Sequence, residues 1–429
     1  MRIGLEVHVA LPTRAKLFCS CSANAEEPNS AICPICLGFP GSKPMLNEAA
    51  LKSTLMIASA LHCRINPQTY FIRKIYFYPD LPKSYQITQL DGAVGHEGYV
   101  DIGKKRIRIR RVQLEEDPAK IIREDEYSLL DFNRSGVPLN EIVTEPDIES
   151  EEELRLFVNE LRSILYYAGV DINKEMKTDL NISLGEERVE IKNVTGIKNL
   201  IDAQRFEVKR QGGLLSANQK VPKETRSYNA ETMSTVSSRE KESDEEYGFI
   251  YEPDLTSYPT AGIDLPPVVI AGDAARSLSA KYGINESTLR ELTLFDKGAL
   301  ELIQHGLQVS KPANVINAIE LLKRRGEISI SREGFGKMLS YLDRGLLLNE
   351  DAISALERNQ PFEVEKNSVS TEEIDRAIIE MVSQRPDLVK EYKANSKAFN
   401  FIVGALLKRY KVNPKYISER LSQVLKDKA

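Results

Sequence analysis

Two acidic-residue motifs and one histidine near the N-terminus could carry chemistry. Residues 1–10 alternate between apolar and polar positions, which predicts a β-strand with Glu6 and His8 on the same face. On a strand these two side chains would project together, about 7 Å apart. A carboxylate beside an imidazole can bind a hard metal ion or act as an acid–base pair. An ordinary exposed strand face would show the same pattern.

A run of three carboxylates, Glu115-Glu116-Asp117, follows the alternating basic stretch KKRIRIRR at 104–111. Consecutive acids repel one another and usually belong to solvated turns. Here Lys120 follows closely, and acids beside cations also suit a Mg²⁺ site in which a nucleotide completes the ion's coordination shell. Together with Glu6 and His8, the triplet predicts a magnesium site that serves phosphate chemistry.

The sequence contains no G-x-x-x-x-G-K-[ST] motif, so a nucleotide would have to be bound without a P-loop. A dinucleotide glycine fingerprint and a G-x-S-x-G elbow are also absent from the sequence. Candidate phosphate-contacting cations are Arg73, Lys74 and Lys83 in the stretch 71–86, and Arg134 in DFNRSGVPLN. Each of them could equally be a surface charge.

Two further alternating stretches lie at 178–184 and 188–192. The first places Asp179 and Asn181 on one face, and the second alternates Glu190 and Lys192 around an isoleucine. These polar faces could extend the cleft that carries Glu6, although the solvent face of a sheet is an equally ordinary interpretation.

Four of the five cysteines are clustered as Cys19-x-Cys21 and Cys33-x-x-Cys36. This spacing predicts a tetrahedral zinc site with four thiolate ligands, and a site with no open position is structural. Reduced free thiols are the alternative. The isolated Cys63 is interpreted as a small buried apolar residue.

Several local signals define the elements that must position these residues. Helices are expected at 47–61, with Asn47 as the cap, at 150–168, with Ser150 as the cap, and from about 197 to Gly212-Gly213. The polar, charged segment 226–246 is expected to be a mobile connector or lid.

The pattern of elements predicts an α+β protein: a cradle-like domain with a mixed sheet, followed by an all-helical domain and a small helical tail. We expect boundaries at 1–265 for the catalytic domain, which contains the zinc-binding segment 19–36, and at 266–360 and 361–429 for the helical parts. A chain of 429 residues is long enough for two or three such domains.

The composition is that of a globular protein, with 41% hydrophobic and 28% charged residues. The N-terminus has no apolar run long enough for a signal peptide or a membrane span, so a cytoplasmic protein is expected. The net charge is −5, yet the last forty residues hold ten Lys/Arg against three Asp/Glu. This local charge of +7 suggests a docking site for a polyanion, although a solvated helical surface is equally compatible with it.

The sequence resembles the B subunit of the aspartyl/glutamyl-tRNA amidotransferases. The resemblance is carried by IGLEVHVALPTRAKLFCSC, CPICLGFPGSKPMLN, RKIYFYPDLPKSYQITQ, QLEEDPAK, DFNRSGVPLNEIVTEPD, NISLGEERVEIKN and FNFIVGALLKRYKVNP. These stretches run from residue 3 to the C-terminal tail, so essentially the whole chain is covered.

The resemblance implies that ATP phosphorylates the side-chain carboxylate of misacylated Glu-tRNA(Gln) or Asp-tRNA(Asn), and that ammonia then displaces the phosphate. It implies a catalytic set of Glu6, His8, Glu115 and Glu116, which would bind Mg²⁺ together with Asp117. Binding of ATP and substrate is assigned to Lys74, Lys83, Lys120, Arg134, Asp179 and Asn181.

The resemblance also implies partners. A glutamine amidase, the A subunit, would supply ammonia from glutamine, and a small C subunit would complete a heterotrimer. The basic tail would bind tRNA phosphates through Lys397, Lys408, Arg409, Lys411 and Lys415. Two other functions fit the same residues: a zinc-stabilised tRNA-binding scaffold without chemistry, and a metal-dependent phosphoesterase.

Overall fold

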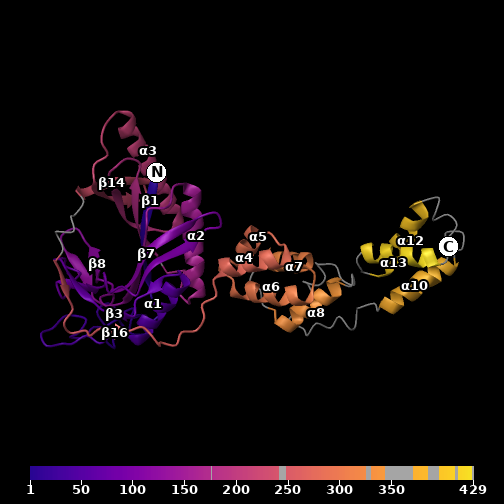
Figure 1. The fold of residues 1–429 in the computed structure, drawn as a ribbon, viewed down its shortest axis with the longest axis horizontal. Coiled ribbons are helices and arrows are strands. Elements are labelled where there is room, and N and C mark those ends of the chain that lie inside the picture. Colours follow the sequence, from indigo (N-terminus) through magenta and orange to yellow (C-terminus); the bar gives the residue numbers. More distant parts are fainter. Residues whose placement is uncertain are drawn as a thin grey trace. The chain divides into compact units, whose positions relative to one another are not determined.

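The structure is a computed structural model that describes residues 1–174, 176–240, 248–324, 330–343, 371–384, 396–410 and 414–427. It divides into two units, Met1–Gly272 and Asp273–Ala429 (Figure 1). The first unit is built around a mixed β-sheet and the described part of the second is helical. The α+β fold class predicted from the sequence is confirmed.

The main sheet of the first unit has nine strands in the order β14-β13-β12-β11-β1-β10-β7-β6-β2. Neighbouring strands are antiparallel except β12 and β13, which are parallel. The strands are β1 (Arg2–Ala10), β2 (Arg64–Ile65), β6 (Gly95–Asp101), β7 (Arg106–Glu116), β10 (Pro138–Thr144), β11 (Lys177–Ser183), β12 (Val189–Thr195), β13 (Glu224–Asn229) and β14 (Ser234–Glu240).

Three small sheets accompany the main one. They are β15-β4-β5, β16-β3 and the hairpin β8-β9. Their strands are β3 (Gln68–Thr69), β4 (Ile72–Ile75), β5 (Tyr85–Thr88), β8 (Lys120–Arg123), β9 (Ser128–Asp131), β15 (Gly248–Tyr251) and β16 (Tyr258–Pro259). Strand β5 lies against β7, where the Thr88 hydroxyl donates a hydrogen bond to Glu115.

Strand β1 lies in the middle of the main sheet, and its alternating sequence gives it two different faces. The apolar residues at 3, 5, 7 and 9 are buried in a core shared with helices α1 (Glu48–Ala60), α2 (Glu151–Tyr167) and α3 (Ile197–Ser216). These helices cover the apolar face of the sheet (Figure 1). The opposite face is left to the polar side chains of β1 and its neighbours.

The predicted helix starts are confirmed. The side chain of Asn47 accepts a hydrogen bond from the Ala49 amide at 3.0 Å, and Ser150 accepts one from the Glu153 amide at 3.1 Å. Helix α3 does not close at Gly212-Gly213 but continues to Ser216. Leu214 packs against the core, and this packing offsets the weak helix propensity of the two glycines.

The sequence predicts a mobile connector at 226–246, and the described part of this segment contradicts that prediction. Most of it forms β13 and β14, a hairpin that extends the main sheet. Two residues of this hairpin are held in place by the fully buried Glu207 of α3, which pairs with Arg226 at 3.2 Å and accepts a hydrogen bond from Thr235. Polar residues of this segment can therefore form a strand because Arg226 and Thr235 meet a buried partner from a distant helix. Residues 241–247 lie outside the described ranges.

The second unit contains two separate hydrophobic cores in its described residues. One involves Leu289, Ile303 and Phe335, and the other involves Ile378 and Leu421. The three-domain division predicted from the sequence stays a prediction. The helices are α4 (Ala271–Tyr282), α5 (Glu286–Thr293), α6 (Lys297–Val309), α7 (Pro312–Arg324), α8 (Arg332–Asp343), α10 (Thr371–Gln384), α12 (Ser396–Arg409) and α13 (Pro414–Asp427).

Four of the five predicted tRNA-binding residues belong to the last two described helices. Lys408 and Arg409 are exposed in the last turn of α12, Lys397 lies in α12 and Lys415 in α13. Lys411 lies outside the described residues. Among the helices that are described, none has both the length and the apolar character needed to cross a bilayer.

Candidate functional site

The register of the main sheet brings His8 together with two carboxylates from distant parts of the chain. His8 of β1 is the direct partner of Glu141 on β10, and Glu115 comes from β7, the next strand. The His8 Nε2 atom lies 3.6 Å from Glu115 Oε1 and 3.8 Å from Glu141 Oε2. One ligand atom from each residue lies within 4.8 Å of the other two, so the three can hold a single cation.

The electrostatics of this group favour a bound cation. Burial raises the pKa of the Glu141 carboxyl, and the nearby charge of Glu115 raises it further. Burial alone would lower the pKa of His8, but the charges of four carboxylates together outweigh it, so the pKa of His8 is raised; these belong to Glu115, Glu141, Asp179 and Glu6. Two buried carboxylates beside an imidazole form a negatively charged pocket, and a divalent ion would relieve their repulsion.

Neighbouring side chains fix the two carboxylates in place. The Gln113 side chain donates to Glu141 Oε2 at 2.9 Å, and Thr88 donates to Glu115 Oε2 at 2.9 Å. The guanidinium of Arg111 lies 3.5 Å from Glu141 Oε1. These contacts restrict the rotation of both carboxylates, so their oxygens stay beside His8.

A second acidic group lies on the other side of β1. Glu6 is the direct partner of Asp179 on β11, and Glu190 comes from β12. One oxygen atom from each of these residues lies within 4.8 Å of the others. Lys192 contacts this group, with its Nζ 3.3 Å from Asp179 and 3.4 Å from Glu190.

Asn181 completes the second group. Its amide donates to Glu6 Oε1 at 3.1 Å, while its own Oδ1 is buried without a hydrogen-bond partner in the described structure. An unpaired buried oxygen beside three carboxylates is the kind of atom that a hydrated cation would satisfy. Burial raises the pKa of Glu6, as do the charges of Glu141 and Glu190, so the two acidic groups interact across β1.

The acidic triplet does not act as one unit. Glu115 faces His8, whereas Glu116 is bound by Lys83 Nζ at 2.5 and 2.6 Å and by the amide of Ile87 at 2.9 Å. Successive side chains on a strand point to opposite faces, so Glu115 and Glu116 cannot both join the same ion. Asp117 follows the strand, 3.5 Å from Arg134, and burial raises its pKa. The structure thus separates Glu116 and Asp117 from the ligand set predicted for them.

The predicted phosphate-binding cations have varied environments. Lys83 is paired with Glu116, and Arg134 donates to the carbonyl oxygens of Pro118 and Ala119. Lys74 lies in β4, and its charge acts on the Glu141 carboxyl of the first group. Lys120 is exposed at the start of β8. Lys83 and Arg134 therefore stabilise the end of β7. Of the predicted phosphate-binding cations, Lys74 is the one whose charge acts on the His8–Glu115–Glu141 group.

Glu141 is not singled out by the sequence patterns, and Glu190 appears in them only as part of a polar strand face and not as a predicted ligand. Glu141 belongs to β10, PLNEIVT, in which all seven residues are buried. A carboxylate in a fully buried strand is costly unless it has a functional partner, so its position in an apolar stretch is the available signal. Glu190 is part of a recognisable alternating strand, but nothing in the sequence shows that this strand lies close to Glu6.

The four clustered cysteines converge as their spacing predicts. One sulfur from each of Cys19, Cys21, Cys33 and Cys36 lies within 4.8 Å of the others. Zn²⁺ with bonds of about 2.3 Å to four thiolates needs such a cluster. A hydrogen bond from Cys19 is the largest of the effects that lower the pKa of Cys36 to about 4, so this sulfur is readily a thiolate. The donor set therefore fits zinc.

We expect the purified protein to contain about one equivalent of zinc by metal analysis, because four converging sulfurs form a closed site. The Cys33→Ser variant should lose this metal. Cys63→Ser is the matched control, since Cys63 lies outside the cluster and should leave the zinc content unchanged. Less than half an equivalent in the wild-type protein would contradict the four-thiolate site.

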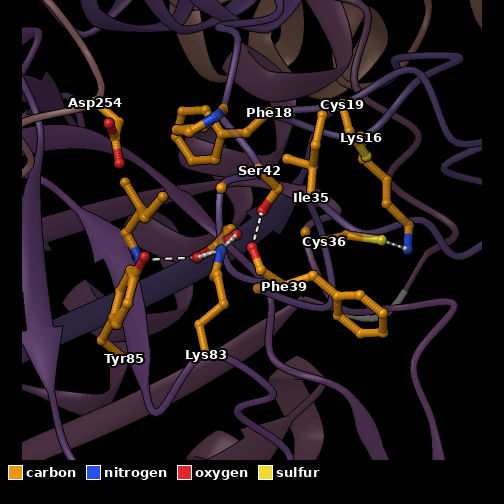
Figure 2. A pocket seen from close by; sticks show the side chains of 16 residues that line it. Lys16, Phe18, Cys19, Ile35, Cys36, Phe39, Ser42, Lys83, Tyr85 and Asp254 are labelled. Atoms are coloured by element: carbon orange, nitrogen blue, oxygen red, sulfur yellow. Dashed lines mark hydrogen bonds and ion pairs between the residues drawn. The ribbon is translucent and has the colours of Figure 1, made fainter.

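A cavity of about 180 Å³ lies between the cysteine cluster and the end of β7. Lys16 and Cys36 line one part of it, and Lys83 lines another (Figure 2). Glu116, the partner of Lys83, also lines this cavity. The cysteine segment and the Lys83–Glu116 pair thus form walls of the same cavity.

Comparison with known proteins identifies the family. Residues 1–261 match the GatB/GatE catalytic domain. The chain is 36% identical to the aspartyl/glutamyl-tRNA(Asn/Gln) amidotransferase B subunit of Methanoregula boonei, with 99% of this chain and 98% of the relative covered. The proteins of the same name from Sulfurisphaera tokodaii and Thermotoga maritima are 35% and 34% identical, with 99% of this chain and at least 98% of each relative covered. A domain match and full-length relatives together show that this chain belongs to the family of aspartyl/glutamyl-tRNA(Asn/Gln) amidotransferase B subunits.

Proposed function

We propose that this protein is the component of an ATP-dependent amidotransferase that converts misacylated Glu-tRNA(Gln), Asp-tRNA(Asn) or both into the amide forms. The observation that carries the proposal is the pair of acidic groups on one face of the main sheet, His8–Glu115–Glu141 and Glu6–Asp179–Glu190. Two neighbouring cation sites suit phosphoryl transfer, in which negative charge must be neutralised on several oxygens at once.

The chemistry explains why such a site is needed. The side-chain carboxylate of the amino acid is a poor electrophile with no good leaving group. Transfer of the γ-phosphoryl group of ATP to it gives an acyl phosphate, and attack by ammonia then releases inorganic phosphate and leaves the amide. Mg²⁺ at the two groups would supply charge neutralisation for the transferring phosphoryl group.

The side chains of this protein hold that site in shape. Glu115, Glu141 and His8 converge from three adjacent strands, so their positions are fixed by the hydrogen bonding of the sheet. Lys192 holds Asp179 and Glu190 together, and Asn181 orients Glu6. Lys74 supplies a positive charge near Glu141, where the nucleotide phosphates would be neutralised.

Ammonia must come from a second protein. The sequence carries no Ser-Ser-Lys amidase signature and no glutaminase cysteine site, since its clustered cysteines fit zinc. The proposed partners are a glutamine amidase, the A subunit, with a small C subunit that stabilises the pair. Structural Zn²⁺, ATP and Mg²⁺ complete the proposed cofactors, and we expect a complex that acts on charged tRNA to work in the cytoplasm.

Reconstitution tests this function directly. The chain is incubated with its amidase partner, ATP, Mg²⁺, glutamine and Glu-tRNA(Gln), and the formation of Gln-tRNA and ADP is followed. We expect both products in stoichiometric amounts, and ammonium chloride should replace glutamine and the amidase. Binding of tRNA without ATP consumption would support a tRNA-binding scaffold, and hydrolysis of phosphate esters without amide formation would support a phosphoesterase.

The C-terminal tail is proposed to bind tRNA through its phosphates. Deleting 361–429 is expected to raise the KM for tRNA about tenfold or more at physiological salt, because several phosphate contacts are lost. The rate at saturating tRNA with ammonium as donor should change little. An unchanged KM would contradict tail docking, and the wild-type KM should rise steeply with salt if the contacts are ionic.

A further inference from the structure

Lys16 is a lysine with no exposed side chain, and it is one of the largest fully buried residues among those that the structure describes. Its Nζ atom donates to two acceptors, the Sγ atom of Cys36 at 3.6 Å (Figure 2) and the carbonyl oxygen of Phe132 at 3.1 Å. Within the described structure no carboxylate forms an ion pair with it. A buried ammonium requires a compensating negative charge, and of these two acceptors only the cysteine sulfur can carry one.

The contact between Lys16 and Cys36 would partly neutralise the negative charge of a four-thiolate zinc site. Four thiolates around Zn²⁺ carry a net charge of −2, which is costly in a partly buried position. Cys36 is the buried ligand of the set, and besides Lys16 it accepts a hydrogen bond from the Cys33 amide at 3.2 Å. Hydrogen bonds to ligand atoms orient them and reduce the charge that the site must hold.

The same lysine connects the cysteine cluster to the end of β7. The Leu17 amide donates to the Gly136 carbonyl at 2.7 Å, and the Gly136 amide donates to the Asp117 carbonyl at 2.9 Å. The Lys16–Phe132 bond holds the other end of this short segment. Residues 132–136 are therefore bound on one side by Lys16 and Leu17 and on the other by the strand end that carries Glu116.

The turn after Cys36 contacts Lys83 as well. Gly38 has a φ of +71°, and a Cβ atom at this position would clash with the side chain of Lys83, so the turn packs directly on that lysine. Lys83 in turn binds Glu116. A displacement of the cysteine cluster would therefore displace the Lys83–Glu116 pair through two sets of contacts. One set runs through residues 132–136, and the other is the packing of Gly38 on Lys83.

We propose that Lys16 is the positioning residue of the four-thiolate centre: its buried ammonium offsets the thiolate charge at Cys36 and ties the metal-bound loop to the end of β7. The proposal rests on the zinc site of the proposed function and not on the transamidation reaction. Lys16 contacts no reacting atom; it acts through Cys36 and the segment 132–136.

The test measures metal affinity and needs neither ATP nor tRNA. Apo-protein is loaded with Zn²⁺ in competition with a chromophoric chelator, and with Co²⁺, whose thiolate-to-metal absorption reports four-sulfur coordination. Lys16→Met, which keeps the length of the side chain, is expected to weaken zinc binding by about 10–100-fold. Lys43→Met is the matched control, because Lys43 is exposed in the same loop region and should leave affinity unchanged.

A double-mutant cycle separates this role from general damage to the fold. If Lys16 acts through the Cys36 thiolate, Lys16→Met should cost much less affinity when Cys36 is already serine. Lys16→Gln, which keeps a donor without the charge, should fall between wild type and Lys16→Met. Equal zinc affinity in wild type and Lys16→Met, a full effect retained in the Cys36→Ser background, or a wild-type protein that binds no zinc would each overturn the proposal. A failure of tRNA amidation alone would leave it standing.

Discussion

Replacing Glu141 with glutamine is expected to lower the rate of ATP-dependent amidation about 10²–10³-fold, the loss typical when one electrostatic partner of a developing charge is removed. Glu141 supplies a ligand oxygen to the His8 group from the strand next to β1. Glutamine has nearly the same shape and keeps an oxygen that can accept the hydrogen bond of Gln113. The variant therefore removes charge without removing the packing of the strand.

The fold of the Glu141→Gln variant should be intact, and its stability equal to wild type or higher, because a buried carboxylate that repels Glu115 becomes neutral. The readouts are Gln-tRNA formation and the Mg²⁺ concentration that gives half-maximal rate, which should rise. Glu145→Gln is the matched control: Glu145 follows the same strand but pairs with Arg110 at 2.9 Å. Wild-type kinetics in Glu141→Gln would remove Glu141 from the site.

Replacing Lys83 with methionine is expected to lower the free energy of unfolding by about 3–5 kcal/mol. Lys83 and Glu116 form a buried pair, with 8% and 5% of their side chains exposed. Loss of the ammonium leaves the buried Glu116 carboxyl with the Ile87 amide as its one remaining hydrogen-bond partner among the described residues. Since the protein contains no tryptophan, circular dichroism of the denaturant titration is the suitable measurement.

A second substitution distinguishes this cause from simple loss of packing. Glu116→Gln in the Lys83→Met background should recover most of the stability, because the uncompensated charge is then gone. Lys52→Met is the control, because it breaks an exposed pair with Glu48 on α1 that contributes less than about 0.5 kcal/mol. If Lys83→Met is no more destabilising than Lys52→Met, the pair does not hold the end of β7.

Local sequence patterns were sufficient wherever the structure depends on near neighbours along the chain. The alternation of residues 1–10 predicted a strand with Glu6 and His8 on its polar face, and β1 has this form. Side-chain caps at Asn47 and Ser150 predicted two helix starts. The cysteine spacing predicted a four-sulfur cluster, because ligands within one short stretch of chain can converge by local turns.

The sequence alone could not determine which strands are neighbours. Glu141 and Asp179 lie far from β1 along the chain, and only the strand order of the sheet places them on either side of it. The same limit applies to the triplet Glu115-Glu116-Asp117, which in the sequence has the pattern of a single acidic cluster. In the folded sheet, Glu115 lies beside His8, whereas Glu116 pairs with Lys83.

The physical reason is that a residue's alternation along a strand is local, whereas strand pairing and register are set by contacts across the whole unit. The sequence by itself therefore determined the types of ligand, the faces on which they lie and the cysteine cluster. Only the tertiary structure shows that the acidic residues form two groups, His8–Glu115–Glu141 and Glu6–Asp179–Glu190, on opposite sides of β1.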